Sequence, residues 1–260
     1  MNIEASFIRS AAGASDLPRD GLAEIVFVGR SNVGKSSLIN ALVRQRIART
    51  SAAPGKTRLA NVYRVARGQT AAMYLIDLPG YGFATGGSAG FEELAGEYFE
   101  RGSRQGRERR DQEMSPAHPV RIGALLLVDA RHPGLDNDRK AWTWLKETAA
   151  GAALVATKID KLARGQRIRA MRQLESAFAD SVLPVSAVTG EGLDELWKLI
   201  DSLANRPSRN NSSLSRPSRN NRLSRPSRRS AKVPAAMARP RLGEMTSLEK
   251  TTRALRPPRK

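Results

Sequence analysis

Four residues with a fixed spacing have the chemistry of a phosphate-binding loop. Gly29, Gly34, Lys35 and Ser36 fit the pattern Gly-x-x-x-x-Gly-Lys-Ser. Backbone without side chains at the two glycines lets successive N–H groups turn inward around the phosphates of a nucleotide. Lys35 would reach the β and γ phosphates, and the Ser36 hydroxyl would ligate a magnesium ion that bridges them. The alternative is a glycine-rich turn that carries Lys and Ser without binding a phosphate.

The residues around this loop predict the elements that would hold it in place. Ile25 to Val28 is a short apolar run of strand-forming residues that ends at Gly29, and Lys35 to Leu42 is compatible with a helix. The helix would add the positive end of its dipole to the anion site. This order of strand, glycine loop and helix favours the phosphate-binding interpretation over the simple turn.

A second group of polar residues follows a strand-like run at residues 72–76. Asp77 opens the sequence Asp-Leu-Pro-Gly, which ends at Gly80. An acidic residue at the carboxyl end of a strand, beside a tight glycine turn, lies where the magnesium ion and γ-phosphate of a nucleotide would be. Asp-x-x-Gly alone is weak support, since many β-turns have this composition. Its position about forty residues after the phosphate loop strengthens the interpretation.

The chain up to residue 204 alternates apolar strands with helices. Further strand-like runs are 61–67, 122–128, 152–156 and 182–185, and helix-like runs are 91–104, 138–148, 162–179 and 193–203. This alternation predicts an α/β fold with a mainly parallel sheet of six strands and helices on both faces. The polar motifs all fall at the carboxyl ends of strands, where such sheets bind ligands.

Composition excludes several classes of protein. The chain of 260 residues has no cysteine, which excludes disulfides and thiolate metal sites, and we expect a reducing compartment. The longest strongly apolar stretch, 123–128, has the length of a strand and not of a membrane span. Residues 1–9 lack a basic region followed by an apolar segment, so we expect no signal peptide. We therefore expect a cytoplasmic protein without stable membrane insertion.

The formal net charge of +19 is concentrated near the C-terminal end. Residues 205–260 hold 16 of the 44 Lys and Arg residues and 2 of the 25 acidic residues, so they carry +14 of the total. They also hold 7 of the 14 prolines, an imperfect Arg-Pro-Ser-Arg repeat and no aromatic residue. This segment has nothing with which to build a core, and we predict that it is a disordered basic tail.

Five motifs, in order, resemble those of the EngB (YihA/YsxC) family of bacterial GTPases. They read Gly-Arg-Ser-Asn-Val-Gly-Lys-Ser-Ser from Gly29, Pro-Gly-Lys-Thr from Pro54, Asp-Leu-Pro-Gly-Tyr-Gly-Phe-Ala from Asp77, Val-Asp-Ala-Arg-His from Val128 and Thr-Lys-Ile-Asp-Lys from Thr157. The resemblance covers residues 3–204. It implies a P-loop GTPase (Ras-like) domain over residues 24–204, with an N-terminal arm at 1–23 and the tail at 205–260.

The resemblance implies a role in nucleotide binding for five segments. The phosphates would be held by Gly29, Arg30, Ser31, Asn32, Val33, Gly34, Lys35 and Ser36. The first switch would consist of Gly55, Lys56, Thr57, Arg58 and Leu59, and the γ-phosphate sensor of Asp77, Leu78, Pro79 and Gly80. The base would be held by Thr157, Lys158, Ile159, Asp160, Ser186, Ala187 and Val188. Ser36 and Thr57 would ligate Mg²⁺, with GTP or GDP as the bound nucleotide.

The chemistry of the base site can be argued from the residues themselves. The Asp160 carboxylate can accept hydrogen bonds from both the ring N–H and the exocyclic amine of guanine, whereas adenine has no ring N–H there and would leave a buried carboxylate unpaired. Lys158 would support the ring, and the Ala187 backbone N–H would meet the guanine oxygen. The usual first residue of this motif is Asn; the family resembled also carries Thr, as this chain does at Thr157. The alternative is an ordinary polar strand end.

Catalysis requires a positioned water and neutralisation of the charge on the γ-phosphate. The residues expected to contribute are Lys35, Thr57, Gly80 and Asn32. Tyr81 stands where many such enzymes place Gln, so we expect slow intrinsic turnover. Asn32 has the position that ligates a monovalent cation in related potassium-activated GTPases, which makes K⁺ a candidate cofactor. The alternative is that Asn32 only tightens the loop through an Asx-type hydrogen bond.

The resemblance also implies a cellular role. It implies a GTP-switched factor that acts in assembly of the large ribosomal subunit and whose loss disturbs cell division and septation. The expected partners are GTP or GDP and the large subunit or its precursor, contacted through ribosomal RNA, with electrostatic help from the tail; we expect a monomer. The alternative is a division-linked GTPase that acts directly on septum machinery. A metabolic P-loop kinase is disfavoured because it leaves Thr157 to Asp160 unexplained.

Three further features have mainly structural interpretations. His132 is expected to be structural or to lie at a partner surface, since nothing places it near the γ-phosphate. Trp142 and Trp144 are two apart on a helix and cannot share a face, so we expect one in the core and the other partly exposed. The basic run at 101–110 is expected to be a solvated loop, with an RNA contact as the alternative.

Overall fold

The computed structural model describes residues 2–49, 59–81, 95–99 and 121–205. All of these residues belong to one compact unit, Met1–Asn211. Several predictions fall outside the described residues: the first-switch residues Gly55, Lys56, Thr57 and Arg58, most of the helix at 91–104, the basic run at 101–110, and nearly all of the tail.

The described strands form one seven-stranded sheet in the order β1-β3-β4-β2-β5-β6-β7. The strands are β1 Ile3–Ala11, β2 Ala23–Gly29, β3 Ala60–Arg67, β4 Met73–Asp77, β5 Ile122–Asp129, β6 Gly151–Thr157 and β7 Val182–Pro184. β2 pairs in parallel with β4 and β5, and β6 pairs in parallel with β5 and β7, whereas β3 runs antiparallel to β1 and β4. The predicted α/β class with a mainly parallel sheet is confirmed.

The number of strands differs from the prediction, because the sheet has seven strands and not six. The additional strand is β1, which the sequence interpretation assigned to the N-terminal arm. It pairs antiparallel with β3, from Ile3 opposite Arg67 to Ala11 opposite Ala60. Ile3, Ala5 and Phe7 alternate with the polar Glu4 and Ser6, but residues 6–10 are all exposed, so the alternating pattern that indicates a strand is short.

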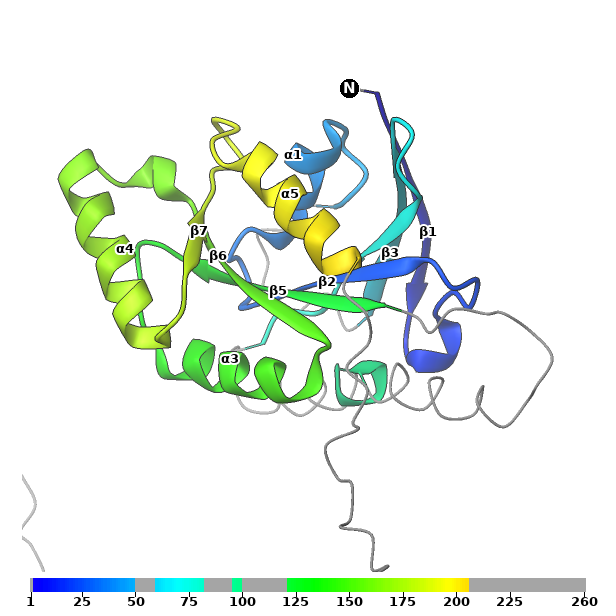
Figure 1. The fold of residues 1–260 in the computed structure, drawn as a ribbon, viewed down its shortest axis with the longest axis horizontal. Coiled ribbons are helices and arrows are strands. Elements are labelled where there is room, and N and C mark those ends of the chain that lie inside the picture. The colour runs from blue at the N-terminus through cyan, green and yellow to red at the C-terminus, as the bar shows by residue number, and fades with distance from the viewer. Residues whose placement is uncertain (1, 50–58, 82–94, 100–120, 206–260) are drawn as a thin grey trace, which may run out of the picture. The chain divides into compact units, whose positions relative to one another are not determined.

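Helices cover both faces of the sheet, as Figure 1 shows for α1 and α5 on one side and α3 on the other. The helices are α1 Lys35–Val43, α3 Asp136–Thr148, α4 Arg164–Phe178 and α5 Leu193–Ala204, with short 3₁₀ turns at η1 Ala14–Asp16 and η2 Ile159–Lys161. Residues 95–99 are also helical, and the Tyr98 hydroxyl donates a hydrogen bond to Glu24 in β2. None of the described helices is long and apolar enough to cross a membrane.

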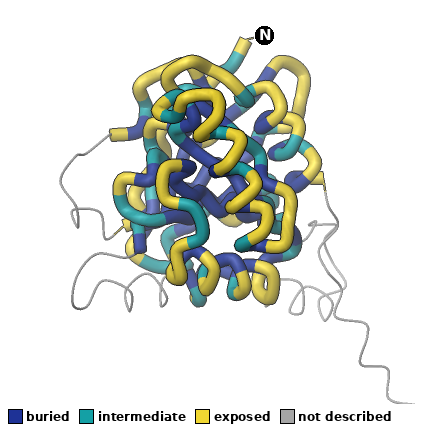
Figure 2. Tube along the Cα trace, turned by 90° about the vertical axis from the view of Figure 1, so that its left-hand side faces the viewer, coloured by how far each residue is buried: buried dark blue, intermediate teal, exposed yellow. Residues whose placement is uncertain are grey.

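The core has two parts, because successive side chains of a strand point to opposite faces. In β2, Ile25 and Phe27 pack with α1 and α5, whereas Val26 and Val28 pack on the other face with α3, α4 and residues 95–99. Figure 2 shows the buried residues inside the described fold. Trp142 is buried in this core, while Trp144 is partly exposed and packs edge-to-face on Phe99, which confirms the prediction for the two tryptophans.

Candidate functional site

The loop between β2 and α1 has the backbone of an anion cradle. Gly34 has a φ of 110°, a conformation that residues with a side chain rarely adopt. At Gly29 a Cβ atom would lie 2.8 Å from the Leu127 carbonyl oxygen, so a side chain does not fit. Several loop N–H groups make no hydrogen bond within the described part of the chain, namely those of Asn32, Gly34, Lys35 and Ser36. Unpaired donors at a helix N-terminus bind anions, so this geometry suits a phosphate.

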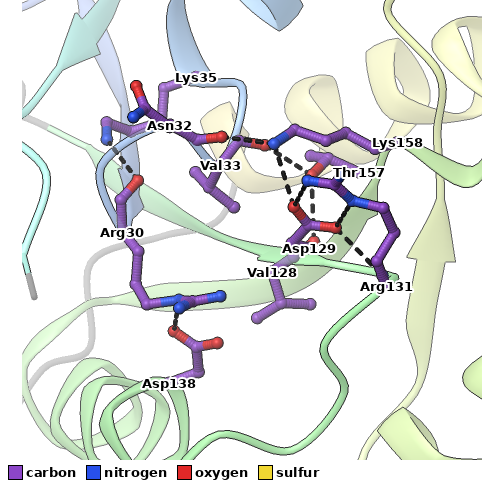
Figure 3. A network of polar contacts seen from close by, with 10 residues as sticks. All are labelled: Arg30, Asn32, Val33, Lys35, Val128, Asp129, Arg131, Asp138, Thr157 and Lys158. Carbon is purple, nitrogen blue, oxygen red and sulfur yellow. Dashed lines mark hydrogen bonds and ion pairs between the residues drawn. The ribbon is translucent and has the colours of Figure 1, made fainter. Parts of the chain in front are cut away.

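Lys35 extends its ammonium group along the loop. Its Nζ donates hydrogen bonds to the carbonyl oxygens of Gly29 at 3.0 Å and Arg30 at 3.3 Å (Figure 3). Burial lowers the pKa of Lys35, and the nearby Asp77 carboxylate partly opposes this shift. The ammonium group is thus held over the loop, where a phosphate oxygen could replace a carbonyl as its acceptor.

Ser36 and Asp77 place two oxygen atoms side by side at the end of β4. The Ser36 hydroxyl donates to Asp77 Oδ2 at 2.7 Å. Burial raises the pKa of Asp77, while Lys35 and the Ser36 hydrogen bond act in the opposite direction. Among the described residues, no group of three or more His, Cys, Asp or Glu side chains is arranged so that it could hold a metal ion by itself. The two oxygens therefore fit Mg²⁺, which typically takes one or two protein ligands and completes its shell with phosphate and water.

The segment that follows β4 lies directly against the phosphate loop. The Ser31 N–H donates to the Tyr81 carbonyl oxygen at 3.2 Å. A Cβ atom at Gly80 would lie 2.5 Å from Ser31 N, so the close approach requires glycine. Leu78 and Pro79 are buried. Of the segments predicted to contact the phosphates, the structure therefore brings Gly29–Ser36 and Asp77–Gly80 together.

Two residues at the carboxyl end of β6, Thr157 and Lys158, connect the predicted base loop to the phosphate loop. Thr157 Oγ1 donates to the Val33 carbonyl oxygen at 2.7 Å. Lys158 has a φ of 60°, and its Nζ donates to the Asn32 carbonyl oxygen and, at 3.0 Å, to Asp129 Oδ2 (Figure 3). The contacts to Val33 and Asn32 join residues more than a hundred positions apart, and no local pattern in the sequence indicates them.

Asp129, at the end of β5, is the anchor for Lys158. The Arg131 guanidinium donates to both of its carboxylate oxygens, from Nε at 2.9 Å and from Nη2 at 2.7 Å. Burial alone would raise the pKa of Asp129, but the hydrogen bonds from Arg131 and Lys158 outweigh it and lower the pKa. His132, which follows Arg131 in the chain, is exposed and donates its backbone N–H to the Asp129 carbonyl oxygen. The motif Val-Asp-Ala-Arg-His is thus part of an ion-pair network of Asp129 with Arg131 and Lys158. The sequence alone does not predict this network.

Asp160 and Ser186 form the other end of the site. The fully buried Ser186 hydroxyl donates to Asp160 Oδ1 at 2.7 Å. Burial alone would raise the pKa of Asp160, but hydrogen bonding by Ser186 and the charge of Lys161 hold it below its usual value. The Ala187 N–H makes no hydrogen bond within the described residues. An ionised carboxylate and an unpaired N–H are therefore close to each other, as a guanine ring requires.

The remaining predicted site residues differ in how they are placed. Ile159 is buried in the core, Val188 is 77% exposed and Leu59 is 41% exposed. Arg30 contributes a carbonyl to the loop, but its side chain points away and pairs with Asp138 in α3 (Figure 3). Asn32 is exposed, and its side-chain amide makes no hydrogen bond to the described part of the protein. The structure therefore gives no support to an Asx-type bond at this position.

Together, the fold and the three loops at the carboxyl ends of β2, β4 and β6 define a P-loop GTPase. A family model described as "50S ribosome-binding GTPase" matches residues 24–158. A probable GTP-binding protein EngB of Lachnospira eligens is 38% identical over 193 residues, which is 72% of this chain and 83% of the relative. The EngB of Chlorobaculum parvum is 38% identical over 208 residues, which is 77% of this chain and 98% of the relative. The chain belongs to the EngB family and is a GTP-hydrolysing enzyme that binds GTP and GDP.

The fold is also similar to that of a solved structure from another GTPase. The crystal structure of Era in complex with MgGDPNP and nucleotides 1506–1542 of 16S ribosomal RNA superposes with a TM-score of 0.55 at 20% sequence identity. The similar region covers 71% of this chain but 57% of the Era chain. At this identity the similarity shows the shared fold alone.

Proposed function

We propose that this GTPase is a nucleotide-dependent switch in assembly of the large ribosomal subunit, and that normal cell division and septation depend on it. The observation that carries the proposal is the family match over residues 24–158, because that family is described as ribosome-binding. Era, a GTPase of similar fold, was crystallised with ribosomal RNA, which supports an RNA contact as part of the proposal.

In this proposal the phosphates of GTP or GDP bind in the loop Gly29–Ser36, where unpaired N–H groups and the Lys35 ammonium supply positive charge. Ser36 ligates Mg²⁺ together with Thr57 of the first switch, 55–59. The Mg²⁺ ion neutralises charge on the β and γ phosphates when it is bound. Gly80 reports the γ-phosphate through its backbone, and Lys35, Thr57 and Gly80 stabilise the charge that develops during hydrolysis.

Guanine selectivity is proposed to come from Asp160. Its carboxylate accepts from two N–H groups of guanine, Ala187 donates to the guanine oxygen, and Ser186 holds the carboxylate in place. Thr157 is proposed to act indirectly on the base, because its hydroxyl donates to the Val33 carbonyl oxygen in the phosphate loop. Lys158 also donates to this loop, at the Asn32 carbonyl oxygen.

Turnover without a partner is proposed to be slow. The Tyr81 hydroxyl is engaged by Asp138 at 2.8 Å, so it is not available to orient a water. We further propose that a potassium ion at Asn32 supplies part of the missing charge neutralisation. The exposed Asn32 amide, which has no partner among the described residues, supports this assignment.

The division of the chain is part of the same proposal. Residues 24–204 form the GTPase domain and 205–260 a disordered basic tail that attracts ribosomal RNA without reading its sequence. The 1–23 arm contributes β1 to the sheet of that domain. We propose that the protein acts as a monomer in the cytoplasm.

The proposal is tested by co-sedimentation with purified large ribosomal subunits. Full-length protein and a chain ending at Ala204 are each loaded with a non-hydrolysable GTP analogue or with GDP, and Lys35→Ala in the full-length chain provides a control with an impaired phosphate site. We expect both chains to sediment with subunits in the GTP form and not in the GDP form. We also expect the truncated chain to bind with a flatter dependence on salt concentration.

Two results would contradict this function. Binding that requires the tail, ignores the nucleotide and survives Lys35→Ala would mean electrostatic adhesion. Absence of subunit binding in every form would favour the alternative, a division-linked GTPase that acts directly on septum machinery.

A further inference from the structure

One buried carboxylate contacts both the phosphate loop and the segment that follows Gly80. Asp138, in the first turn of α3, is 1% exposed. Its Oδ1 accepts a hydrogen bond from the Tyr81 hydroxyl at 2.8 Å and lies 3.3 Å from Arg30 Nε. Arg30 directly follows β2, and Tyr81 lies four residues after the end of β4. A single side chain of α3 therefore joins the ends of two neighbouring strands.

The two joined segments also touch through their backbones. Arg30 and Tyr81 form a parallel bridge beyond the last regular pair of β2 and β4, which is Phe27 with Asp77. Next to this bridge, Gly80 packs against Ser31 so closely that a Cβ atom would not fit. Pairing frays most readily beyond the ends of strands, so this bridge is where a side-chain restraint has most effect.

The charges around Asp138 suit a lasting contact. Burial raises the pKa of Tyr81, and the Asp138 charge raises it further, so the hydroxyl remains protonated and donates. Burial also raises the pKa of Asp138, while Tyr81 and Arg30 favour its ionised form and Asp129 opposes it. Asp138 Oδ2 and Arg30 Nε have no hydrogen-bond partner within the described part of the chain. A buried charge of this kind costs free energy, and its geometric effect among the described residues is to fix Arg30 and Tyr81.

We propose that Asp138 is a positioning residue of the nucleotide site, which holds Gly80 beside the phosphate loop through Tyr81 and Arg30. This inference rests on the proposed role of Gly80 as the γ-phosphate sensor. Ordering a loose segment costs conformational entropy, and a ligand that needs the ordered form binds more weakly by that amount. With Asp138 in place, the segment is ordered before the γ-phosphate arrives. GDP has no γ-phosphate, so its affinity does not depend on this restraint.

The test uses full-length protein and the variant Tyr81→Phe, which removes the hydroxyl and keeps the buried ring. We expect affinity for a non-hydrolysable GTP analogue to fall about tenfold, the factor expected from a hydrogen bond to a charged group, and GDP affinity to change less than twofold. Asp138→Asn, which keeps the shape and removes the charge, should give the same selective loss. Nucleotide affinities are measured by isothermal titration calorimetry.

The chain offers a matched control in Tyr74→Phe. Tyr74 is also a buried tyrosine on this face, and its hydroxyl donates to Asp20 Oδ2 at 2.7 Å. Tyr74→Phe should lower thermal stability about as much as Tyr81→Phe, without changing either nucleotide affinity. Both variants lose one tyrosine–aspartate hydrogen bond. A difference between their nucleotide affinities therefore reflects where the lost bond lies and not general destabilisation of the fold.

A second readout needs no nucleotide. Amide hydrogen exchange at residues 77–81 should be faster in Tyr81→Phe than in the wild type and unchanged in Tyr74→Phe. Equal effects of Tyr81→Phe on GTP analogue and GDP, no effect on either, or unchanged exchange would overturn the inference. If Asp138→Asn does not fold, Tyr81→Phe alone decides. If the wild type binds neither nucleotide, the proposed function fails. The hydrogen-exchange measurement then still tests whether Asp138 restrains residues 77–81 through Tyr81.

Discussion

Replacing Ser186 by Ala tests whether Asp160 must be held in place to bind guanine. Ser186 donates to Asp160 at 2.7 Å and accepts from the N–H groups of Val188 at 3.2 Å and Thr189 at 3.1 Å. A hydrogen bond to a charged group contributes about 1.5–3 kcal/mol. The two N–H groups belong to exposed residues that water can reach, so their loss adds little. We therefore expect the free energy of unfolding to fall by about 2 kcal/mol.

The same variant should weaken nucleotide binding without distinguishing GTP from GDP. An unrestrained Asp160 carboxylate must be ordered when guanine binds, and a cost of about 1.4 kcal/mol corresponds to a tenfold loss of affinity. Urea unfolding measures the stability, and calorimetric titration with GDP and a GTP analogue measures the affinities. Ser176→Ala, at an exposed position of α4, is the control. If Ser186→Ala lost the expected stability but bound GDP as tightly as the wild type, the reasoning would be refuted.

Three further perturbations have outcomes that follow from the site. Asp77→Asn removes the carboxylate that lies 2.7 Å from the Ser36 hydroxyl; we expect magnesium-dependent GTP affinity to fall at least about tenfold, as calorimetric titration with a GTP analogue in the presence and absence of Mg²⁺ would reveal. GTP hydrolysis should be several-fold faster in potassium than in sodium chloride, and Asn32→Ala should abolish this difference; equal rates in the wild type would rule out the cation site. The folded-state pKa of Asp129 is lowered by Arg131 and Lys158, so its stabilising contribution is fully present above the unfolded pKa of about 3.9 and is lost as pH falls through the lower folded value. Urea unfolding between pH 5 and pH 2 should therefore show a steeper loss for the wild type than for Asp129→Asn, and parallel curves would contradict the assignment.

The phosphate loop could be predicted because its signal is local. Gly29, Gly34, Lys35 and Ser36 lie within eight residues, and the apolar run Ile25 to Val28 before them lies inside β2, Ala23–Gly29. Strand ends are also local features, since β4, β5 and β6 end at the polar residues Asp77, Asp129 and Thr157. Parallel sheets bring such ends to one edge, so the pattern of strands alone predicts where the candidate site lies.

The connections between the loops could not be predicted in this way. The hydrogen bond from Thr157 to Val33 joins residues 124 positions apart, and that from Tyr81 to Asp138 joins residues 57 apart. No periodic pattern in the sequence indicates that Thr157 pairs with Val33 or that Tyr81 pairs with Asp138. Which loops touch depends on the order of strands in the sheet, and a sequence of apolar runs does not specify that order. The same limitation applies to β1, whose place beside β3 depends on the order of strands in the sheet and not on its short apolar alternation at Ile3, Ala5 and Phe7.

The connections fall into two groups with different consequences for the nucleotide. Thr157 and Lys158 join the base loop to the phosphate loop, and in the proposed binding mode both loops contact parts that GTP and GDP share. Perturbing this connection, or Ser186 beyond it, therefore lowers the two affinities together. Asp138 and Tyr81 act where a γ-phosphate would be sensed, so perturbing them lowers one affinity and not the other. A switch needs this second kind of contact, because a ligand shifts an equilibrium only through its different affinities for the two states. The restraint on Gly80 is thus the part of the described site best placed to make the protein respond to the loss of the γ-phosphate.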